Sequence, residues 1–316
     1  MGIGARIDNK LKKEDYSDKN LSRKKELNFI PEEPKYSFDD IILSDHIKER
    51  IFDAANYVKN SKIVFEKWGL SKTHKYSKRM GINFYGVPGT GKTMAAHALA
   101  NYLNRKILVV NYADIESKYV GETPKNIHKV FNVAKETRSI LFFDEADAIL
   151  SKRVTNMDNA TDVSVNQTRS VMLMILNEYQ DFIIFATNFI ENFDSAFMRR
   201  ISMHIKFELP DYSCRKLLWR KYIPDEMPNN IDFDELARKY ENISGSDIST
   251  AVLNAAFKAA RQNCESVEKD YIFESIEDIL ASRKAHQANE KIVVNKRIVT
   301  EDYVKSQIKN GEGDFK

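Results

Sequence analysis

The residues best suited to chemistry form one glycine-rich run, Gly86-Val87-Pro88-Gly89-Thr90-Gly91-Lys92-Thr93. It matches the pattern G-x-x-x-x-G-K-[ST], with an apolar strand predicted before it and a helix after it. Glycine lets backbone N–H groups approach a phosphate closely, and the start of a helix adds partial positive charge. Lys92 could reach the β- and γ-phosphates, and the Thr93 hydroxyl could bind Mg²⁺. The run therefore predicts a site for a nucleoside triphosphate.

A second run, Ile140-Leu141-Phe142-Phe143-Asp144-Glu145, is apolar and ends in two adjacent carboxylates. If the apolar residues form a buried strand, these carboxylates lie at its carboxyl end, next to the predicted phosphate loop. Asp144 could then hold Mg²⁺ through water, and Glu145 could activate a water molecule as a general base. An acidic pair after a strand is often only a solvated turn, but beside the glycine-rich run the catalytic interpretation is favoured.

Three weaker patterns would complete such a site. The Asn188 amide follows another apolar run and could orient the same water, although Asn after a strand is usually a turn residue. Arg199-Arg200 could stabilise charge that develops on a γ-phosphate, from the same chain or from a neighbouring one. Lys118-Tyr119-Val120-Gly121-Glu122 places an aromatic side chain beside a glycine, where it could grip another polypeptide. Each pattern alone is at least as typical of an ordinary surface.

These residues need a scaffold, and the hydrophobic pattern predicts one. Apolar runs predict five strands, at Met80–Tyr85, Lys106–Asn111, Ser139–Phe143, Phe182–Ala186 and Ile201–Phe207. Helical periodicity predicts helices over Thr93–Leu103 and from Thr123-Pro124 onward. Strands that alternate with helices indicate an α/β fold of the P-loop NTPase type, a parallel sheet sandwiched by helices.

Beyond Pro210 the strand signals fade, and a small all-helical domain is predicted. Leu217–Trp219 fall in a helical stretch, and Ser246 is a good N-cap for a helix that carries Ile248. The segment from Cys264 to Lys296 is charged and shows no clear period, so no element is predicted there. We expect three parts: a flexible polar arm (1–35), a large nucleotide-binding domain (36–210), and a small helical lid domain with a C-terminal helix (211–316).

The composition excludes several classes of protein. There are 49 Lys and Arg against 46 Asp and Glu, and this net charge of +3 is too balanced for a dedicated nucleic-acid or membrane-surface protein. Hydrophobic residues make up 42% and charged residues 30%, as in an ordinary globular chain. Two cysteines exclude a disulfide scaffold. No apolar run approaches the ~18–20 residues of a membrane span, so we expect a cytoplasmic protein.

Taken in order, these features resemble the AAA+ ATPase family, specifically its classical AAA group. The matching stretches are Phe38-Asp39-Asp40-Ile41, Gly86–Thr93, Ser117–Glu122, Phe142–Glu145, Asn188, Asp194–Arg200 and Ser244–Ile248. In the family these are the entry segment whose next residues flank adenine, Walker A, a pore loop, Walker B, sensor 1, the arginine fingers and the start of the lid helix. Val87 stands where the family usually has proline. The resemblance adds Asp40, Ile41, Met94 and Ser246 as nucleotide contacts.

The resemblance implies a homo-oligomeric ring, usually a hexamer, that binds ATP and Mg²⁺ between subunits. The implied metal ligands are Thr93 and Asp144. The implied catalytic residues are Lys92, Glu145, Asn188, Arg199 and Arg200, with the two arginines acting on the neighbour's nucleotide. Hydrolysis would move loops that carry Lys118, Tyr119 and Val120 along a central pore and pull a bound polypeptide. The polar segment Lys152–Arg169 lies where the family has a second pore loop, and a mobile surface loop is an equal alternative.

Within the family, the adjacent Arg199-Arg200, with no Pro-Gly between them, is closest to the katanin, spastin and mitochondrial-sorting branch. Residues 1–35 are too few for the folded recruitment domains of such proteins. The sequence has no His-Glu-x-x-His, so the membrane zinc-protease branch is excluded.

Several functions remain compatible with these residues. The first is a motor that remodels, unfolds or disassembles proteins, and the second is a motor subunit that serves a separately encoded protease or nuclease. A nucleic-acid motor is disfavoured by the balanced charge, and nucleic acid is not expected as the direct substrate. A switch with negligible turnover is disfavoured by Glu145, and a GTPase by the missing Asn-Lys-x-Asp motif.

Overall fold

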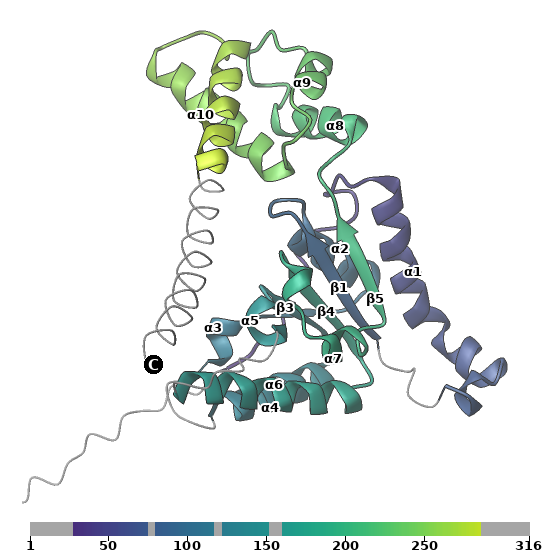
Figure 1. Ribbon diagram of the computed structural model, residues 1–316. Coiled ribbons are helices and arrows are strands. Elements are labelled where there is room, and N and C mark those ends of the chain that lie inside the picture. Colours follow the sequence, from purple (N-terminus) through teal and green to yellow (C-terminus); the bar gives the residue numbers. More distant parts are fainter. Residues whose placement is uncertain (1–27, 75–79, 117–121, 152–159, 286–316) are drawn as a thin grey trace, which may run out of the picture.

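The computed structural model describes residues 28–74, 80–116, 122–151 and 160–285, and a parallel five-stranded sheet lies at its centre (Figure 1). The strands are β1 (Met80–Gly86), β2 (Ile107–Asn111), β3 (Ile140–Asp144), β4 (Phe182–Thr187) and β5 (Met203–Phe207). Each agrees with a predicted strand to within two residues at either end. The predicted fold class, a parallel sheet between helices followed by a helical lid, is confirmed.

The order of the strands is β2-β3-β4-β1-β5, so consecutive strands in the chain are not all neighbours in space. β1 lies between β4 and β5, with Tyr85 opposite Thr187 and Gly86 opposite Phe207. β3 pairs with the other side of β4, with Phe143 opposite Phe185. This order brings the carboxyl ends of β1, β3 and β4 together at one edge of the sheet, where the predicted site residues follow them.

Two helices cover one face of the sheet. They are α1 (Asp45–Lys62), which continues into a π-helix, η1 (Ile63–Lys67), and a 3₁₀ turn, η2 (Leu70–Lys72), and α2 (Lys92–Tyr102). α2 is rich in alanine, and its buried alanines allow it to lie close to the sheet. Ile51 of α1 and Leu99 of α2 pack there in one cluster with Phe84 of β1.

The opposite face carries two longer helices, α4 (Glu122–Thr137) and α6 (Ala160–Glu178), which lie side by side below the sheet in Figure 1. Four short elements complete this layer: α3 (Tyr112–Ile115), α5 (Asp147–Leu150), η3 (Ile190–Asn192) and α7 (Ser195–Met198). Val130 of α4 and Met172 of α6 are fully buried in a cluster with Phe143 and Phe185 of the sheet. Apolar residues on both faces explain why β3 and β4 are continuous hydrophobic runs.

A separate helical unit follows β5 and lies beyond the carboxyl ends of the strands (Figure 1). It contains α8 (Tyr212–Tyr222), α9 (Phe233–Lys239), α10 (Gly245–Arg261) and a further helical stretch over residues 269–285. Its own core gathers around Trp219, Ile248 and Ile272, all fully buried. The stretch 269–285 lies in the segment to which the sequence pattern assigned no element.

The start of α10 corrects one prediction. Ser246 was expected as the N-cap, but the helix begins at Gly245 and Ser244 is the N-cap. The Ser244 hydroxyl accepts a hydrogen bond from Asp247 N, and the Asp247 carboxylate accepts one from Ser244 N at 2.6 Å. This reciprocal capping box requires an acidic residue three positions after the cap, which Ser244 has and Ser246 lacks.

At the outer edge of the sheet, β2 pairs with a residue of the predicted N-terminal arm. Glu32 forms an antiparallel bridge with Ile107, with N···O distances of 2.8 and 3.0 Å between their backbone groups. Lys106 adds an ion pair with Glu33 at 3.0 Å. The described part of the arm, residues 28–35, therefore lies against the sheet. The domain boundaries at residues 35 and 210 stay predictions, and the C-terminal helix lies outside the described residues.

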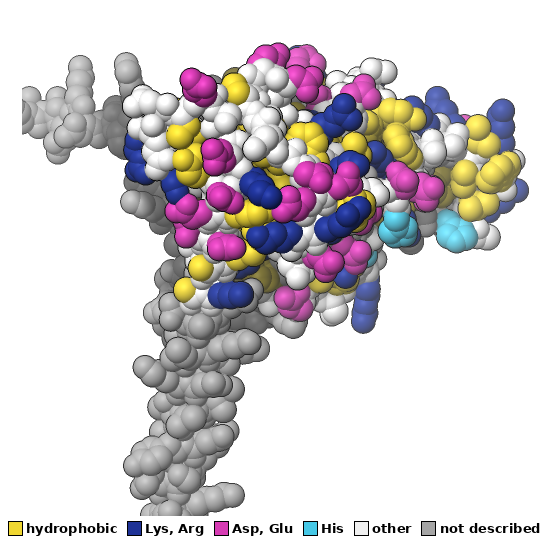
Figure 2. All heavy atoms as spheres, turned by 90° about the horizontal axis from the view of Figure 1, so that it is seen from above, with side chains coloured by type: hydrophobic (Ala, Val, Ile, Leu, Met, Phe, Trp, Pro, Cys, Tyr) yellow, Lys and Arg dark blue, Asp and Glu magenta, His cyan; other side chains and the backbone are white. Residues whose placement is uncertain are grey.

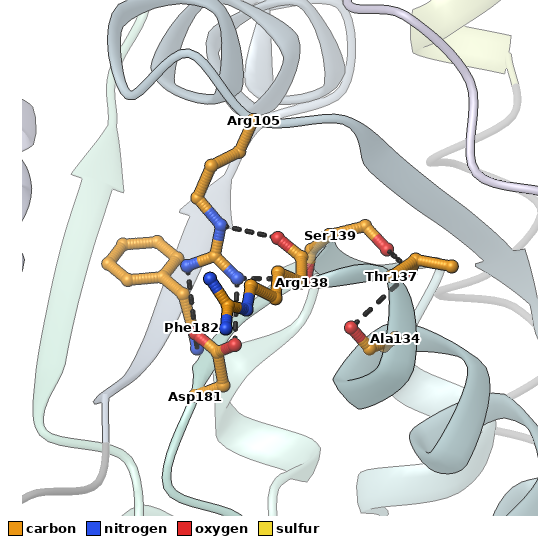
Figure 3. Close-up of polar contacts among 7 residues, drawn as sticks. All are labelled: Arg105, Ala134, Thr137, Arg138, Ser139, Asp181 and Phe182. Atoms are coloured by element: carbon orange, nitrogen blue, oxygen red, sulfur yellow. Dashed lines mark hydrogen bonds and ion pairs between the residues drawn. The ribbon is translucent and has the colours of Figure 1, made fainter.

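At the amino edge of the sheet, Arg105 connects the segments that precede β2, β3 and β4 (Figure 3). The Arg105 guanidinium forms two 2.8 Å hydrogen bonds with the Asp181 carboxylate, just before β4. It also donates to the carbonyl of Arg138 at 2.7 Å and to that of Ser139 at 3.3 Å, just before β3. A planar guanidinium with several donors suits such a junction. This cluster lies at the end of the strands opposite to the predicted nucleotide site.

Seen from the side of the lid, basic and acidic side chains are intermixed over the surface of the molecule (Figure 2). No helix within residues 28–74, 80–116, 122–151 and 160–285 has the length and hydropathy needed to cross a membrane.

Candidate functional site

The glycine-rich run forms the turn between β1 and α2, as predicted. Gly86 ends β1 with φ of +134°, and a Cβ atom there would lie 2.1 Å from the carbonyl oxygen of Phe207 on β5. Gly89 has φ of +75°, and a Cβ there would lie 2.7 Å from the Ser244 hydroxyl and from Cβ of Ser246. A side chain is therefore excluded at both positions, because the loop must pass close to β5 and to the lid.

Lys92 begins α2, and its side chain folds back over the loop. The ammonium group donates to the carbonyl oxygens of Gly86 at 2.8 Å and Val87 at 3.0 Å. The residue is only 9% exposed, and this burial lowers the lysine pKa from 10.5 to about 8, against the opposing effect of Asp144 and Asp147. A phosphate group in the loop would replace the two carbonyl oxygens with stronger, charged acceptors.

Thr93 and Asp144 bring two oxygen atoms together beside Lys92. The Thr93 hydroxyl donates to Oδ2 of Asp144 at 2.9 Å, which joins the start of α2 to the end of β3. Hydroxyl and carboxylate oxygens fit Mg²⁺, which usually keeps several water ligands and also takes substrate phosphate oxygens. Across the described part of the chain, His, Cys, Asp and Glu nowhere gather in groups of three that could hold a metal ion by themselves. The Thr93 and Asp144 oxygens suit a metal ion that also takes oxygen ligands from a nucleotide.

Glu145 follows Asp144 in an unusual backbone conformation. Its φ is +49°, in the left-handed region that few non-glycine residues adopt, and its N–H donates to Oδ1 of Asp144 at 3.0 Å. Such strain is found where surrounding structure fixes a functional side chain. Glu145 lines the same cavity as Lys92 and Thr93, in a place where a carboxylate could accept a proton from water.

Asn188 lines this cavity from the end of β4, and a carboxylate that the sequence reasoning missed fixes its backbone. Asp147, at the start of α5, accepts a hydrogen bond from the Thr187 hydroxyl and another from Asn188 N at 3.4 Å. Ala146 N also donates to the carbonyl of Ala186 at 2.9 Å. The signal for Asp147 was a third acidic residue, one turn after Asp144.

The cavity has a volume of about 500 Å³ and lies between the large domain and the lid. Most of the predicted nucleotide contacts line it, namely Asp40, Ile41, Pro88, Gly89, Thr90, Gly91, Lys92, Thr93, Met94, Asp144 and Ser246. Gly86 and Val87 are not among the lining residues: Gly86 lies in β1, and Val87 contributes its carbonyl to Lys92 and to the Thr90 hydroxyl.

The cavity also has an apolar end, of which the resemblance pointed only to the residues that follow Ile41. Ile42, Leu43 and Ile47 line it from the large domain, and Leu218 and Tyr222 line it from α8 of the lid. Apolar walls of this kind suit a nucleobase. No sequence period marks these residues, because they come from an irregular segment and from two helices far apart in the chain.

Two polar contacts join the lid to the large domain. The Lys221 ammonium of α8 donates to the carbonyl oxygen of Asp40. Ser246 N at the start of α10 donates to the carbonyl of Gly89 in the phosphate loop at 3.2 Å. Asp247, which caps α10, also forms a 2.5 Å ion pair with Arg283 in the stretch 269–285. The position of the lid is thus linked directly to the loop that would hold phosphate.

The two predicted arginines lie elsewhere. Arg199 follows α7 and is exposed, whereas Arg200 donates to the Asn177 amide oxygen at 2.9 Å and to the Ala196 carbonyl at 2.7 Å. Neither is among the described residues that line this chain's own cavity. The structure therefore brings Lys92, Glu145 and Asn188 of the predicted catalytic set together, and leaves the arginines outside.

The predicted pore residues Lys118, Tyr119 and Val120 lie outside the described residues. So do residues 152–159 of the expected second pore loop. The remainder of that segment, residues 160–169, is part of α6, and Arg169 at its end is buried, so the loop interpretation is wrong for this part.

Comparison with known proteins agrees with the geometry. Residues 82–209 match the family described as "ATPase family associated with various cellular activities (AAA)", and residues 230–274 match the AAA+ lid domain. The chain is 32% identical over 279 residues to cell division protein C of Sulfolobus acidocaldarius. The aligned region covers 84% of this chain and 71% of that protein.

Two other similar proteins carry the name proteasome-activating nucleotidase. The one from Archaeoglobus fulgidus is 32% identical over 79% of this chain, and the one from Methanopyrus kandleri is 28% identical over 81%. The matches span 63% and 59% of the length of these two relatives.

Proposed function

Because the chain belongs to the AAA ATPase family, we propose that it is an ATP-hydrolysing ring motor that pulls on a polypeptide in a central pore. Its action would remodel, unfold or disassemble protein substrates. The proposed ring is a homo-oligomer, most simply a hexamer, and each nucleotide site would be completed by the adjacent subunit. ATP hydrolysis by the chain follows from its membership of the family.

One observation carries the ring proposal: the cavity is complete except for an arginine. It holds the phosphate loop with Lys92, the oxygen pair of Thr93 and Asp144, and the carboxylate of Glu145, but no arginine is found among the described lining residues. Arg199 is exposed on the outside of the same domain. A cation that stabilises charge on the γ-phosphate can be supplied in trans, and a ring with heterologous contacts supplies one to every site.

The residues of the cavity then have distinct proposed roles. Lys92 would bind the phosphates, and Glu145 would hold the attacking water and accept its proton, while Asn188 would orient that water. Thr93 and Asp144 would hold Mg²⁺, which neutralises phosphate charge when it is bound with ATP. The lid residue Ser246 contacts Gly89 of the loop, so a change in phosphate occupancy would reach the lid.

The proposal is tested by the mass of the ATP-bound protein. Glu145→Gln should bind ATP without consuming it, so a hexamer of 36.6 kDa chains would give a particle of about 220 kDa. A particle with the mass of a single chain, 36.6 kDa, that persists with ATP at high protein concentration would contradict the ring.

Polypeptide pulling needs a second test, for which unfolded casein is a suitable probe. Casein should change the ATP turnover of the wild type, and Tyr119→Ala should remove that response while keeping basal turnover. Identical responses of the two proteins would contradict a polypeptide grip by Tyr119.

A second candidate function is favoured by the names of two relatives. Proteasome-activating nucleotidases are similar to this chain over about four fifths of its length, which supports a motor subunit that serves a separate protease. The discriminating experiment adds an archaeal proteasome to the chain and follows casein degradation with ATP. ATP-dependent degradation that Glu145→Gln abolishes would favour this function over the stand-alone remodeller.

Two finer assignments are also proposals. The katanin and spastin branch is supported only by the adjacent Arg199-Arg200, and the relatives compared above carry other names. The cytoplasmic location rests on the sequence alone. Nucleic acid is disfavoured as a substrate by the net charge of +3 and by the intermixed charges on the face shown in Figure 2.

A further inference from the structure

The exposed arginine depends on a very short helix for its position. α7 contains only the four residues Ser195–Met198, and Arg199 is its C-cap. One isolated helical turn is not stable, because nucleation is costly and most of its backbone groups lack helical partners. The direction in which Arg199 points must therefore be fixed by residues that hold α7 from outside.

Asp194 holds the start of α7. One of its carboxylate oxygens accepts a hydrogen bond from Ala196 N at 2.7 Å, which makes it the N-cap, and its own N–H donates to the carbonyl of Leu150 at 3.0 Å. The other oxygen forms an ion pair with Arg169 of α6. Asp194 thus connects α7 with the end of α5 and with α6.

Arg169 is an unusual residue to find in this layer. Its side chain is 5% exposed, and its guanidinium lies 5.7 Å from the ring centre of Phe197, the buried residue of α7. Burial of a charge costs free energy, and a packed apolar residue would often stabilise the fold as well or better. An ion pair at this position is therefore better explained by the geometry that it imposes than by stability.

Helix α6 also holds the C-terminal end of α7. Arg200 donates to the Asn177 amide of α6 at 2.9 Å and to the Ala196 carbonyl at 2.7 Å. Asn177 lies eight residues after Arg169, or about 12 Å along the helix axis. Two attachments at this spacing fix both the position and the rotation of α7, which leaves Arg199 exposed at its end.

We propose that Arg169 is a positioning residue for the arginine that each subunit donates to its neighbour. Through Asp194 and Phe197 it sets the orientation of α7, and so the direction of Arg199 at the subunit boundary. This inference rests on the proposed ring, in which Arg199 acts in trans. It predicts that a defect at Arg169 lowers hydrolysis in the neighbouring subunit and leaves the site of its own subunit intact.

The test variant removes the ion pair without leaving a buried charge. Arg169→Met with Asp194→Asn keeps an N-cap side chain on α7, because Asn caps as well as Asp. We expect unchanged binding of a fluorescent ATP analogue and a fall in kcat on the order of a hundredfold, the effect of a catalytic group displaced by about 1 Å. Arg169→Lys should keep part of the activity.

A matched control is available at the amino edge of the sheet. Arg105→Met with Asp181→Asn removes a comparable Arg–Asp pair, whose hydrogen bonds reach residues next to β3 and β4 and none of α7 (Figure 3). Asn at position 181 keeps an oxygen for the 2.7 Å hydrogen bond from Phe182 N. This control should lose stability but keep kcat within about twofold of the wild type.

The decisive readout is a mixing experiment with Glu145→Gln subunits, which cannot hydrolyse ATP but carry intact arginines. Arg199→Ala serves as the reference, because it removes the donated arginine and keeps the contacts of Arg200 with Asn177 and Ala196 that hold α7. Mixed with excess Glu145→Gln, both this reference and the Arg169 double variant should recover at least about tenfold in turnover.

Two results would overturn the inference. Recovery of the reference without recovery of the Arg169 double variant would mean that Arg169 acts on its own subunit, and the ring proposal would stand. Failure of the reference itself would mean that Arg199 does not act in trans, which contradicts both proposals.

Discussion

The buried charge of Lys92 makes a prediction about stability as well as binding. Its ammonium lies among carbonyl groups with 9% of the residue exposed, and burial lowers its pKa from 10.5 to about 8. A difference of this size means that the charged lysine costs the nucleotide-free protein about 3 kcal/mol relative to the unfolded chain. Replacement by methionine removes that cost, together with hydrogen bonds to Gly86 and Val87 worth about 1 kcal/mol each. Near pH 7 the Lys92→Met variant should therefore be about 1 kcal/mol more stable than the wild type.

The sign of the pH dependence follows from the two pKa values. Below pH 8 Lys92 is protonated in both states, so its cost is constant. Between pH 8 and 10.5 the unfolded chain holds the proton that the folded protein has lost, and the free energy of unfolding of the wild type rises by up to ~1.4 kcal/mol per pH unit. The variant lacks this rise. Its advantage should thus become a deficit of about 1–2 kcal/mol at pH 10.

The assay is urea unfolding without nucleotide at pH 7, 8, 9 and 10, followed by circular dichroism. Lys129→Met, at an exposed position of α4, is the matched control and should track the wild type at every pH. In a parallel series at pH 7, Mg-ATP should stabilise the wild type and the control but not Lys92→Met. A difference between wild type and Lys92→Met that stays constant from pH 7 to pH 10 would refute the reasoning about the buried charge.

Three other predictions concern separate parts of the molecule. Glu145→Gln should slow ATP hydrolysis by about 10²–10⁴-fold with ATP affinity kept, because only the general base is lost; single-turnover kinetics would reveal wild-type rates if another group held the water. Gly89→Ala should weaken ATP binding by about tenfold or more, because φ of +75° and contacts of 2.7 Å with Ser244 and Ser246 leave no room for Cβ; calorimetric titration that shows unchanged affinity would contradict the tight approach of loop and lid. Arg105→Met should lower the free energy of unfolding by about 2 kcal/mol and leave kcat unchanged, since the Asp181 carboxylate loses its partner at the inactive edge of the sheet; denaturant unfolding together with turnover checks both parts, and a loss of kcat would show that this edge matters to the site.

The sheet and the nucleotide loop could be predicted from the sequence because their signals are local. β3 and β4 are continuous apolar runs since helices cover both of their faces, and the glycine-rich run contains its own turn chemistry. Carboxyl ends of parallel strands meet at one edge, so Thr93 and Asp144 could be expected at the same edge, where the structure shows them hydrogen-bonded.

What could not be predicted depends on contacts between distant segments. The apolar end of the cavity joins Ile42 and Leu43 to Leu218 of the lid, and no periodic pattern links such residues. The helical stretch 269–285 was missed because its buried face is a narrow one, with Ile272 and Ile276 fully buried among charged neighbours. Ser246 was predicted as the N-cap because serine is a good cap, but the Asp247 side chain forms the capping box with Ser244.

The central claim, that each ATP site is completed by a neighbouring subunit, is tested most directly by turnover per subunit as a function of protein concentration, with Glu145→Gln as the blank. Arg199 lies outside its own cavity, so we predict a specific activity that rises steeply with concentration as rings assemble, and that reaches a plateau when assembly is complete. A specific activity that is well above the blank and constant down to concentrations at which the protein is monomeric by mass would contradict the claim, because a single subunit would then hydrolyse ATP unaided.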